Sequence, residues 1–544
     1  MTSGSLLALR LHAQHPSASR PCAAVTKLRV TAAPEIAPIV RAAAEQLGGV
    51  DGAGCGPIAV TAEEPAVTAG KVRTGHADVW ISSSSAWLSI ASVDNAIYAA
   101  QGPPVARSPI VLAMPKALAE SLWGTKQPTW AEILAKVTTQ QLPTVNMPDP
   151  LHSTVGLLSV LAVRAAMART TADPGIAQLR ALTLRSRIAN PSADTDALLT
   201  QVAGMSDAVQ AAKAVGVFPV TEQQLTTYQD AARRVPLAGM YPPDGIAEAD
   251  YPFATANDLA TDPDRQSLAD RLNHELRSTD IIRALADAGF RPATPATLHA
   301  GLPVTYPTPL SLTTDANQLL AAALQWSQYR KLSFQVLILI DASGSMNDTV
   351  VDRSGHPTTK AALLRESGVN AAQLFSDDTS LGLWYFGTTA AASPPYVEAV
   401  PIGPLTEKVR GVSRRDLLAQ QISTYKPVDQ GGTPLYQTIL DGTEAMRAGA
   451  KPDVVSLVIV LTDGRDQDSR FVMDRQVFLN RLRSEQDSTN PVPVFGIGFG
   501  ADADMATLRD IARETGGQAT AATTPTDLAG AIAQVFLATH EPAR

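Results

Sequence analysis

Short apolar segments alternate with segments of helical periodicity along the first half of the chain. The segments Leu28–Ala32 and Ile58–Thr61 are rich in small and β-branched residues, whereas 36–47 carries apolar residues at the spacing of a helix. The alternation continues at 108–122, where a strand-like segment leads into a helix-like one. Strands that alternate with helices form open, mostly parallel sheets. The pattern therefore predicts an α/β fold.

The second half of the chain shows the same alternation more strongly. Continuous apolar runs rich in Val, Ile and Leu are typical of parallel strands that are covered on both faces. The expected strands of this half lie at 334–340, 381–386, 454–461 and 493–498.

A Pro-, Thr- and Leu-rich stretch, 294–314, separates the two halves and predicts a linker. A helix is expected directly after it, over 315–331. A chain of 544 residues is also too long for one ordinary core. We therefore expect a leader or disordered segment at 1–21, a first domain at 22–293, a linker and connecting helix at 294–332, and a second domain at 333–540.

The composition excludes several classes of protein. The net charge of −8, without any dense run of Lys or Arg, argues against a nucleic-acid partner. No segment approaches the ~18 apolar residues that cross a bilayer. The start of the chain, "SLLALRLHA", is too short and too charged for the core of a secretion signal. Any membrane attachment is therefore expected through a segment absent from this chain.

The chain has two cysteines, Cys22 and Cys55, and each precedes an expected strand of the first domain. Neighbouring parallel strands would bring them together as a disulfide, which for a loop of this length stabilises a fold by roughly 3–4 kcal/mol. The alternative is a pair of unrelated buried thiols. The disulfide is preferred and predicts an oxidising location outside the cytosol.

Polar side chains with oxygen atoms follow the strands of the second domain. In "LILIDASGSMND", at 337–348, Asp341, Ser343 and Ser345 occupy alternate positions after a buried strand and face one side. Thr433 follows two glycines in "DQGGTPLY", and Asp463 follows the strand in "SLVIVLTDG". Loops at the carboxyl ends of parallel strands form one crevice. Hard oxygen ligands without His or Cys suit Mg²⁺, with Mn²⁺ or Ca²⁺ as alternatives.

In this order of motifs the region 333–537 resembles the von Willebrand factor A (VWA) family. The resemblance implies a metal-ion-dependent adhesion site formed by Asp341, Ser343, Ser345, Thr433 and Asp463. It also implies that the hydroxyls bind the ion directly and that the acids act through water. An acidic residue of a partner protein would then fill the open position on the ion.

The first domain resembles bacterial extracellular solute-binding proteins of the type 2 periplasmic class. The resemblance rests on the order of several segments, among them "LRVTAAPEIAPIV", "DVWISSSSAWL", "DPLHSTVGLL" and "AVGVFPVTEQQL". It implies a two-lobe domain, with lobe one at 22–107 and 230–293 and lobe two at 108–229, followed by a Rossmann-like, doubly wound VWA domain.

The cleft of such a domain commonly receives helix N-termini, which favour anions. Several hydroxyl residues at the expected helix N-termini are candidates for the cleft wall. Each of them is equally well explained as the cap of its own helix. Glu35 lies at the first-strand turn, where an oxyanion binder of this class has small hydroxyl residues, and it would repel an oxyanion. The candidate cleft residues are Glu35, Ser83, Ser84, Ser85, Ser153, Thr154 and Thr221.

No nucleophile elbow, P-loop or dinucleotide-binding motif is present, so no catalytic residues are expected. The sequence predicts an extracytoplasmic, non-enzymatic binding protein of the cell envelope that captures a partner carboxylate at a metal. The front domain would serve recognition. One alternative is a solute-uptake or sensing component whose front cleft binds a small ligand and whose VWA domain docks a membrane partner. Another is an assembly subunit that pairs with a cytosolic AAA+ motor.

Overall fold

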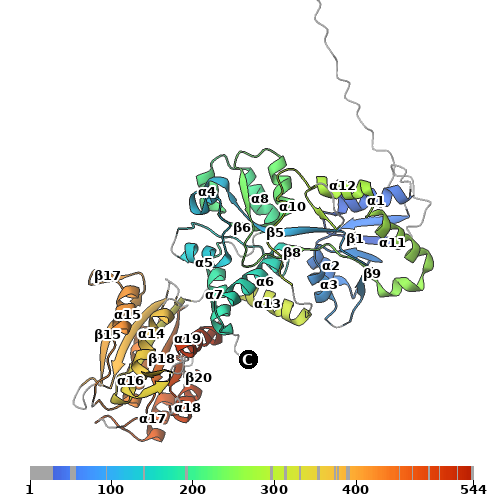
Figure 1. Ribbon diagram of the computed structural model, residues 1–544. Helices are drawn as coiled ribbons and strands as arrows, with labels where there is room; N and C mark the ends of the chain where they lie inside the picture. Colours follow the sequence, from blue (N-terminus) through green and yellow to red (C-terminus); the bar gives the residue numbers. More distant parts are fainter. Residues whose placement is uncertain are drawn as a thin grey trace, which may run out of the picture.

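The computed structural model shows two α/β bodies joined through helices (Figure 1). It describes residues 28–48, 57–93, 95–138, 141–189, 194–293, 298–311, 315–329, 333–351, 356–372, 375, 379–387, 393–429, 431–451, 454–467, 470–487, 490–500, 503–522 and 525–540.

The first lobe of the front domain is built on a five-stranded sheet in the order β2-β1-β3-β9-β4. Strand β1 pairs in parallel with β2 and β3, whereas β9 runs antiparallel to β3 and β4. The strands are β1 (Leu28–Ala32), β2 (Ile58–Ala62), β3 (Val79–Ile81), β4 (Tyr98–Ala100) and β9 (Phe253–Ala256). The helices are α1 (Ala37–Gly48), α2 (Pro65–Lys71), α3 (Ser85–Ala91), the 3-10 helix η1 (Asn257–Thr261), α11 (Pro263–Glu275) and α12 (Thr279–Asp287).

The second lobe is organised by the long strand β5 (Ala106–Pro115), which is buried at every position but Arg107. Four strands pair with it, all antiparallel: β6 (Phe218–Thr221), β7 (Leu237–Met240), β8 (Glu248–Ala249) and β10 (Arg291–Pro292). The helices are α4 (Lys116–Trp123), α5 (Trp130–Thr138), α6 (Thr154–Arg169), α7 (Pro174–Ser186), α8 (Thr195–Ala203), α9 (Ala208–Ala214) and α10 (Glu222–Asp230).

The division into lobes differs from the expected one near 230–293. Strands β7, β8 and β10 fall inside the range expected for lobe one, but they pair with β5. The reason is the length of β5, which offers backbone hydrogen bonds along both edges to four shorter strands.

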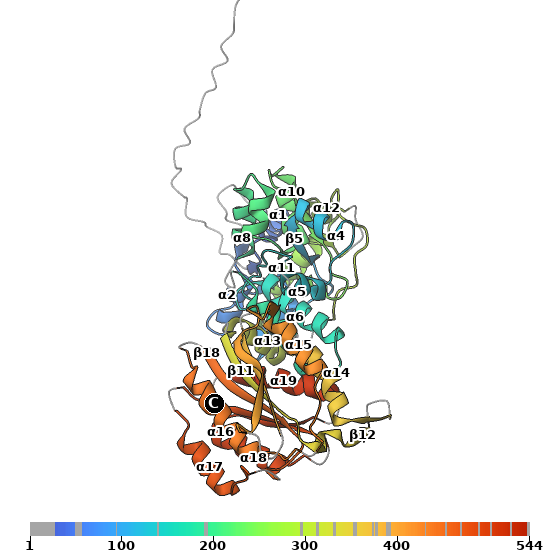
Figure 2. The same cartoon turned by 90° about the vertical axis from the view of Figure 1, so that its left-hand side faces the viewer.

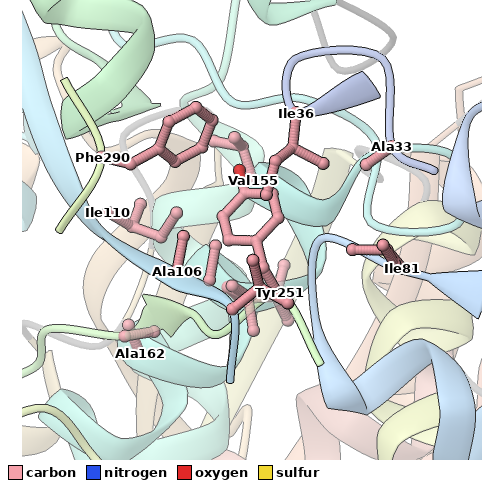
Figure 3. Packing of buried hydrophobic residues seen from close by; sticks show 14 of the residues in the cluster. Ala33, Ile36, Ile81, Ala106, Ile110, Val155, Ala162, Tyr251 and Phe290 are labelled. Carbon is pink, nitrogen blue, oxygen red and sulfur yellow. The ribbon is translucent and has the colours of Figure 1, made fainter. Parts of the chain in front are cut away.

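Tyr251 lies at the centre of the core that joins the two lobes (Figure 3). Its ring is fully buried and meets Phe290 edge to face, with the ring centroids 5.2 Å apart. Side chains of both lobes surround it, including Ile81 from β3 and Ile110 from β5. This shared core fixes the floor of the space between the lobes.

Helix α13 (Ala316–Gln328) packs on the front domain. It contacts α3 and α6, and its Leu319 and Ala323 are buried in one cluster with Trp80 and Trp87. The sequence suggests a connecting helix here, and the apolar face of that helix explains why it closes over the front domain instead of spanning open solvent.

The second domain has a six-stranded sheet in the order β15-β14-β11-β18-β19-β20, parallel except for β15. The four expected strands are confirmed. The sheet strands are β11 (Ser333–Asp341), β14 (Ser380–Phe386), β15 (Tyr396–Pro404), β18 (Val454–Thr462), β19 (Val494–Phe499) and β20 (Ala519–Ala522). Short elements outside this sheet are η2 (Gly344–Asn347), β12 (Thr349–Val351), β13 (Pro357–Thr359), β16 (Lys408–Val409) and β17 (Val412–Ser413).

Helices cover both faces of this sheet (Figure 2). Leu363, Leu418 and Leu528 are buried in the cluster on one face, whereas Phe478 and Leu508 are buried on the other. The helices of the first face are α14 (Lys360–Ala372), α15 (Arg414–Ser423) and α19 (Pro525–His540), and those of the second are α16 (Leu435–Ala448), α17 (Arg475–Ser484) and α18 (Met505–Thr515). Among the described residues, no helix is long and apolar enough to cross a membrane.

The two domains meet where α7 of the front domain packs on α19 of the second (Figure 1). Ile176 and Leu179 of α7 are buried in the same cluster as Leu528 and Ile532 of α19. The helices approach closely because α19 carries a glycine at the contact. A Cβ added to Gly530 would overlap the carboxylate of Asp173, which caps the N-terminus of α7.

We predict that Gly530→Ala weakens this contact. The added methyl overpacks the interface and should cost about 1–3 kcal/mol, seen as a lower melting temperature in scanning calorimetry. Gly70→Ala is the matched control, because Gly70 also lies in a helix but a Cβ there meets nothing within 4 Å. An unchanged melting temperature for Gly530→Ala would show that the contact carries no stability.

Candidate functional site

The polar motifs of the second domain meet at the carboxyl edge of its sheet. Asp341 is the last residue of β11, and Asp463 directly follows β18, the parallel neighbour of β11. Ser343 directly precedes η2, Ser345 lies within it, and Thr433 lies just before α16. Because β11 and β18 run in parallel register, both carboxylates reach the same edge.

Hydrogen bonds link three of these side chains in a row. The Ser343 Oγ and Ser345 Oγ atoms are 3.0 Å apart, and the Ser345 hydroxyl donates to Asp463 Oδ1 at 2.8 Å. The side chain of Asp463 is only 1% exposed. Two hydroxyls and a carboxylate oxygen are therefore brought together at one point.

Asp341 is fully buried behind this row. Its Oδ1 accepts from the Ser343 backbone N at 2.8 Å, and its Oδ2 accepts from the Thr462 hydroxyl at 2.5 Å. Burial and, to a lesser extent, the charge of Asp463 raise the pKa of Asp341 to about 6, against the opposing effect of these hydrogen bonds. The Tyr425 hydroxyl donates to the backbone carbonyl of Asp341 and fixes the strand end.

Thr433 is placed by its backbone. It exchanges two hydrogen bonds with Gln467, Thr433 N to Gln467 O at 2.8 Å and Gln467 N to Thr433 O at 3.1 Å. Gly431, two residues before it, lies so close to Gly387 that an added Cβ would overlap the Gly387 carbonyl. A Cβ on Gly464 would lie 3.5 Å from Thr433 Oγ1 and 3.9 Å from Asp341 Oδ2. Thr433 thus borders the same point as the two acids.

The front domain contains a cleft of about 990 Å³ whose walls come from both lobes. Five of the residues expected to line it do so: Glu35, Ser83, Ser153, Thr154 and Thr221. Ser84 and Ser85 are not among its lining residues. The Ser84 hydroxyl caps α3, and the Ser85 backbone N donates to Asp250 at 2.7 Å.

The family comparisons agree with this two-part geometry. Residues 28–291 match the model "Bacterial extracellular solute-binding protein", and residues 335–534 match the model "von Willebrand factor type A domain". The chain joins a solute-binding domain to a VWA domain. Two proteins of Mycobacterium tuberculosis, "Uncharacterized protein MT1884" (strain CDC 1551 / Oshkosh) and "Uncharacterized protein Rv1836c" (strain ATCC 25618 / H37Rv), are each 27% identical over 92% of this chain and 75% of their own length.

Solved structures resemble each part separately. The solute-binding domain is similar to the sulfate-binding protein SubI from Mycobacterium tuberculosis H37Rv, with 20% identity, 50% of this chain and 88% of that chain covered, and a TM-score of 0.36. The VWA domain is similar to a von Willebrand factor type A protein from Catenulispora acidiphila, with 20% identity, 37% of this chain covered and a TM-score of 0.28. This chain spans only 42% of that protein's length.

Several cleft hydroxyls of the solute-binding domain also cap helices. Ser153 accepts from the Gly156 N at the start of α6, and Thr221 forms a capping box with Gln224 at the start of α10. The hydroxyls of Ser83 and Thr154 are 2.5 Å apart, and the Trp87 indole donates to Thr154 at 2.8 Å. These hydroxyls therefore already have partners within the chain.

The expected Cys22–Cys55 disulfide lies outside the residues that the structure describes. Over those residues, no group of three or more His, Cys, Asp or Glu side chains is arranged to hold a metal.

Lys360 is a charged residue of the VWA site that the sequence analysis missed. It is 1% exposed, and its Nζ lies 2.6 Å from Asp463 Oδ2. The signal in the sequence is its place at the start of α14, since a cation is disfavoured at a helix N-terminus unless a carboxylate compensates it. Asp463 thus faces Lys360 with one oxygen and the serine hydroxyls with the other.

We predict that Lys360→Met destabilises the VWA domain by about 3 kcal/mol, because it leaves the Asp463 carboxylate buried without its cation. Chemical denaturation followed by circular dichroism measures the change. The control is Lys451→Met, since Lys451 is exposed and should tolerate the same substitution. Equal stability of both variants would mean that the ion pair contributes nothing.

Proposed function

We propose that the chain is an extracytoplasmic binding protein whose VWA domain captures a partner carboxylate at a divalent ion. Asp341, Ser343, Ser345, Thr433 and Asp463 would hold the ion, with Mg²⁺ as the expected metal. The observation that carries the proposal is the hydrogen-bonded row Ser343–Ser345–Asp463, in front of the buried Asp341 and bordered by Thr433.

The donor set fits a hard cation. Carboxylate and hydroxyl oxygens are the protein ligands that Mg²⁺ and Mn²⁺ prefer. Asp463 is paired with the ammonium of Lys360, which also lies 3.8 Å from Asp348, so a cation at the serine hydroxyls would relieve the remaining negative charge of the two buried carboxylates. The bound ion would supply an electron-poor position for an acidic group of another protein.

The residues of the site would have different roles in holding the ion. The hydroxyls of Ser343, Ser345 and Thr433 would orient toward the ion. Asp341, fixed by Ser343 and Thr462, would act from behind them, and Lys360 would hold Asp463 in place. The match of residues 28–291 to extracellular solute-binding proteins supports a location outside the cytosol.

We expect the double variant Ser343→Ala/Ser345→Ala to bind Mn²⁺ at least tenfold more weakly than the wild type, because it removes two oxygen ligands. Isothermal titration calorimetry with Mn²⁺ alone measures the affinity. Ser484→Ala is the control, because Ser484 is an exposed serine at the end of α17 and should change nothing.

The second measurement tests carboxylate capture. Poly-L-glutamate should bind the wild-type chain in Mg²⁺ and be released by EDTA. If the double serine variant binds Mn²⁺ as the wild type does, the metal site is wrong. If the double serine variant loses Mn²⁺ affinity as expected, but the wild type binds poly-L-glutamate equally in Mg²⁺ and in EDTA, the metal site is supported and carboxylate capture is wrong.

The cleft of about 990 Å³ favours a second candidate function, a solute-uptake or sensing component. In this function the front cleft binds a small ligand and the VWA domain docks a membrane partner. The contact of α7 with α19 would then link the two activities.

A further inference from the structure

The cleft between the two lobes is unusually acidic for its size. Four carboxylates in its wall make no ion pair with any residue in the described part of the chain: Glu35, Glu64, Asp194 and Asp196. Glu35 accepts a hydrogen bond from the Tyr251 hydroxyl at 2.7 Å and Asp196 one from the Gln224 amide at 3.0 Å, and both of these donors are uncharged. A fifth carboxylate, Asp149, is partnered by the hydroxyl of Ser327, the backbone N of Leu151 and the ring of His152. The wall contains one arginine, Arg233, whose guanidinium lies 5.8 Å from the ring centroid of Tyr228.

The four carboxylates come from opposite sides of the cleft. Glu35 follows β1 and Glu64 directly precedes α2, so both belong to the first lobe. Asp194 caps α8 and Asp196 lies in its first turn, so both belong to the second lobe. Like charges therefore face one another across the space between the lobes.

The mutual effect of these charges is visible in their protonation. Burial and then the charges of Glu35, Asp194 and Asp196 raise the pKa of Glu64 to about 7. Burial raises the pKa of Glu35, and burial with the charge of Asp194 raises that of Asp196. The carboxylates are thus close enough to disfavour one another's ionised form.

A separate feature of the wall calls for a hydrogen-bond donor. Gln223 is 8% exposed and lines the cleft, and its side-chain oxygen is buried without a partner. Its side-chain nitrogen donates to Thr227 Oγ1 at 3.1 Å and to the Ala288 carbonyl at 3.3 Å. Because a carbonyl can only accept, the amide cannot be turned around, and the unpartnered atom is an acceptor.

The hydroxyl of Thr195, between the two second-lobe acids, is a second buried polar group without a partner, and it can donate as well as accept. Thr195 is 2% exposed, lines the cleft, and its Oγ1 has no hydrogen-bond partner. Buried polar atoms without a partner are rare in folded proteins and indicate a missing ligand or water. The amide oxygen of Gln223, an acceptor without a donor, lies in the wall together with carboxylates that have no cation, and this combination matches a ligand that carries N–H groups and positive charge.

We propose that this cleft binds an organic cation with at least two amino or guanidino groups, held between carboxylates of both lobes. A cavity of about 990 Å³ has the size of a small-molecule site and far exceeds a bare metal ion. The negative charge of the wall disfavours an oxyanion. The repulsion between the lobes would favour an open cleft, and a cation bridging them would favour closure. The inference rests on the proposed use of the front domain for recognition, but not on the metal site.

The test is calorimetric titration of the full chain with spermidine, at low salt and with EDTA present. We expect binding at one site, and at least tenfold weaker binding by the double variant Glu64→Gln/Asp196→Asn. The matched control is Glu120→Gln/Asp280→Asn, which makes the same change of charge at one exposed residue of each lobe and should bind as the wild type does. Equal affinity of the two double variants would overturn the proposal.

A pair of ligands tests the role of the unpartnered acceptor. The cations 1,6-diaminohexane and hexamethonium have the same spacer and charge, but only the first has N–H groups. We expect the first to bind at least tenfold more tightly. Equal binding of the two would overturn the role of Gln223.

Two further titrations distinguish other ligand classes. Binding of sulfate or molybdate in place of spermidine would overturn the proposal, and so would binding of Mg²⁺, in buffer without EDTA, that Glu64→Gln/Asp196→Asn abolishes. Spermidine should bind Ser343→Ala/Ser345→Ala as it binds the wild type. This result would separate the cleft from the VWA site, so that a failure of either proposal can be recognised.

Discussion

The burial of two carboxylates at the ends of neighbouring parallel strands is the constraint on which the VWA domain depends. Asp341 and Asp463 are both almost inaccessible to solvent, and each leaves its strand at the same edge of the sheet. Buried charges are tolerated only when hydrogen bonds or opposite charges compensate them. The turn after β11, the hydroxyl of Thr462 and the ammonium of Lys360 supply this compensation.

The solute-binding domain, unlike the VWA domain, leaves several of its carboxylates without a cationic partner. Glu64 and Asp196 face the cleft from opposite lobes without a cation from the described part of the chain. In the VWA domain, by contrast, the buried ammonium of Lys360 neutralises the carboxylate of Asp463 within the fold. The first arrangement favours an external cation, and the second favours a rigid frame that presents a few oxygen atoms. The two proposals therefore assign ligands of opposite charge to the two domains.

The position of α13 and the contact of α7 with α19 decide how the domains are connected. Helix α13 closes over the front domain, and α7 shares a buried cluster with α19. A movement of the second lobe would thus shift the packing of α19, because α7 belongs to that lobe. Packed helices transmit such shifts as small sliding movements.

Much of the fold could be predicted from the sequence, because it depends on local patterns. The apolar runs around Val336 and Val458 predict buried parallel strands, and the capping residue Thr221 predicts the start of α10. The convergence of Asp341 and Asp463 also follows from sequence, since strand ends in a parallel sheet share an edge. By contrast, β7, β8 and β10 could not be assigned to β5, because short strands carry little pattern of their own.

The sequence by itself determined the two domains and the order of the motifs in the VWA site. Only the tertiary structure decided which side chains compensate these motifs and what faces the front cleft. Lys360 is separated from Asp463 by 103 residues, and Glu64 and Asp196 approach each other only through the meeting of two lobes. Local periodicity records which face of an element is buried. It does not record which distant charge will lie against that face, because that depends on how the elements pack.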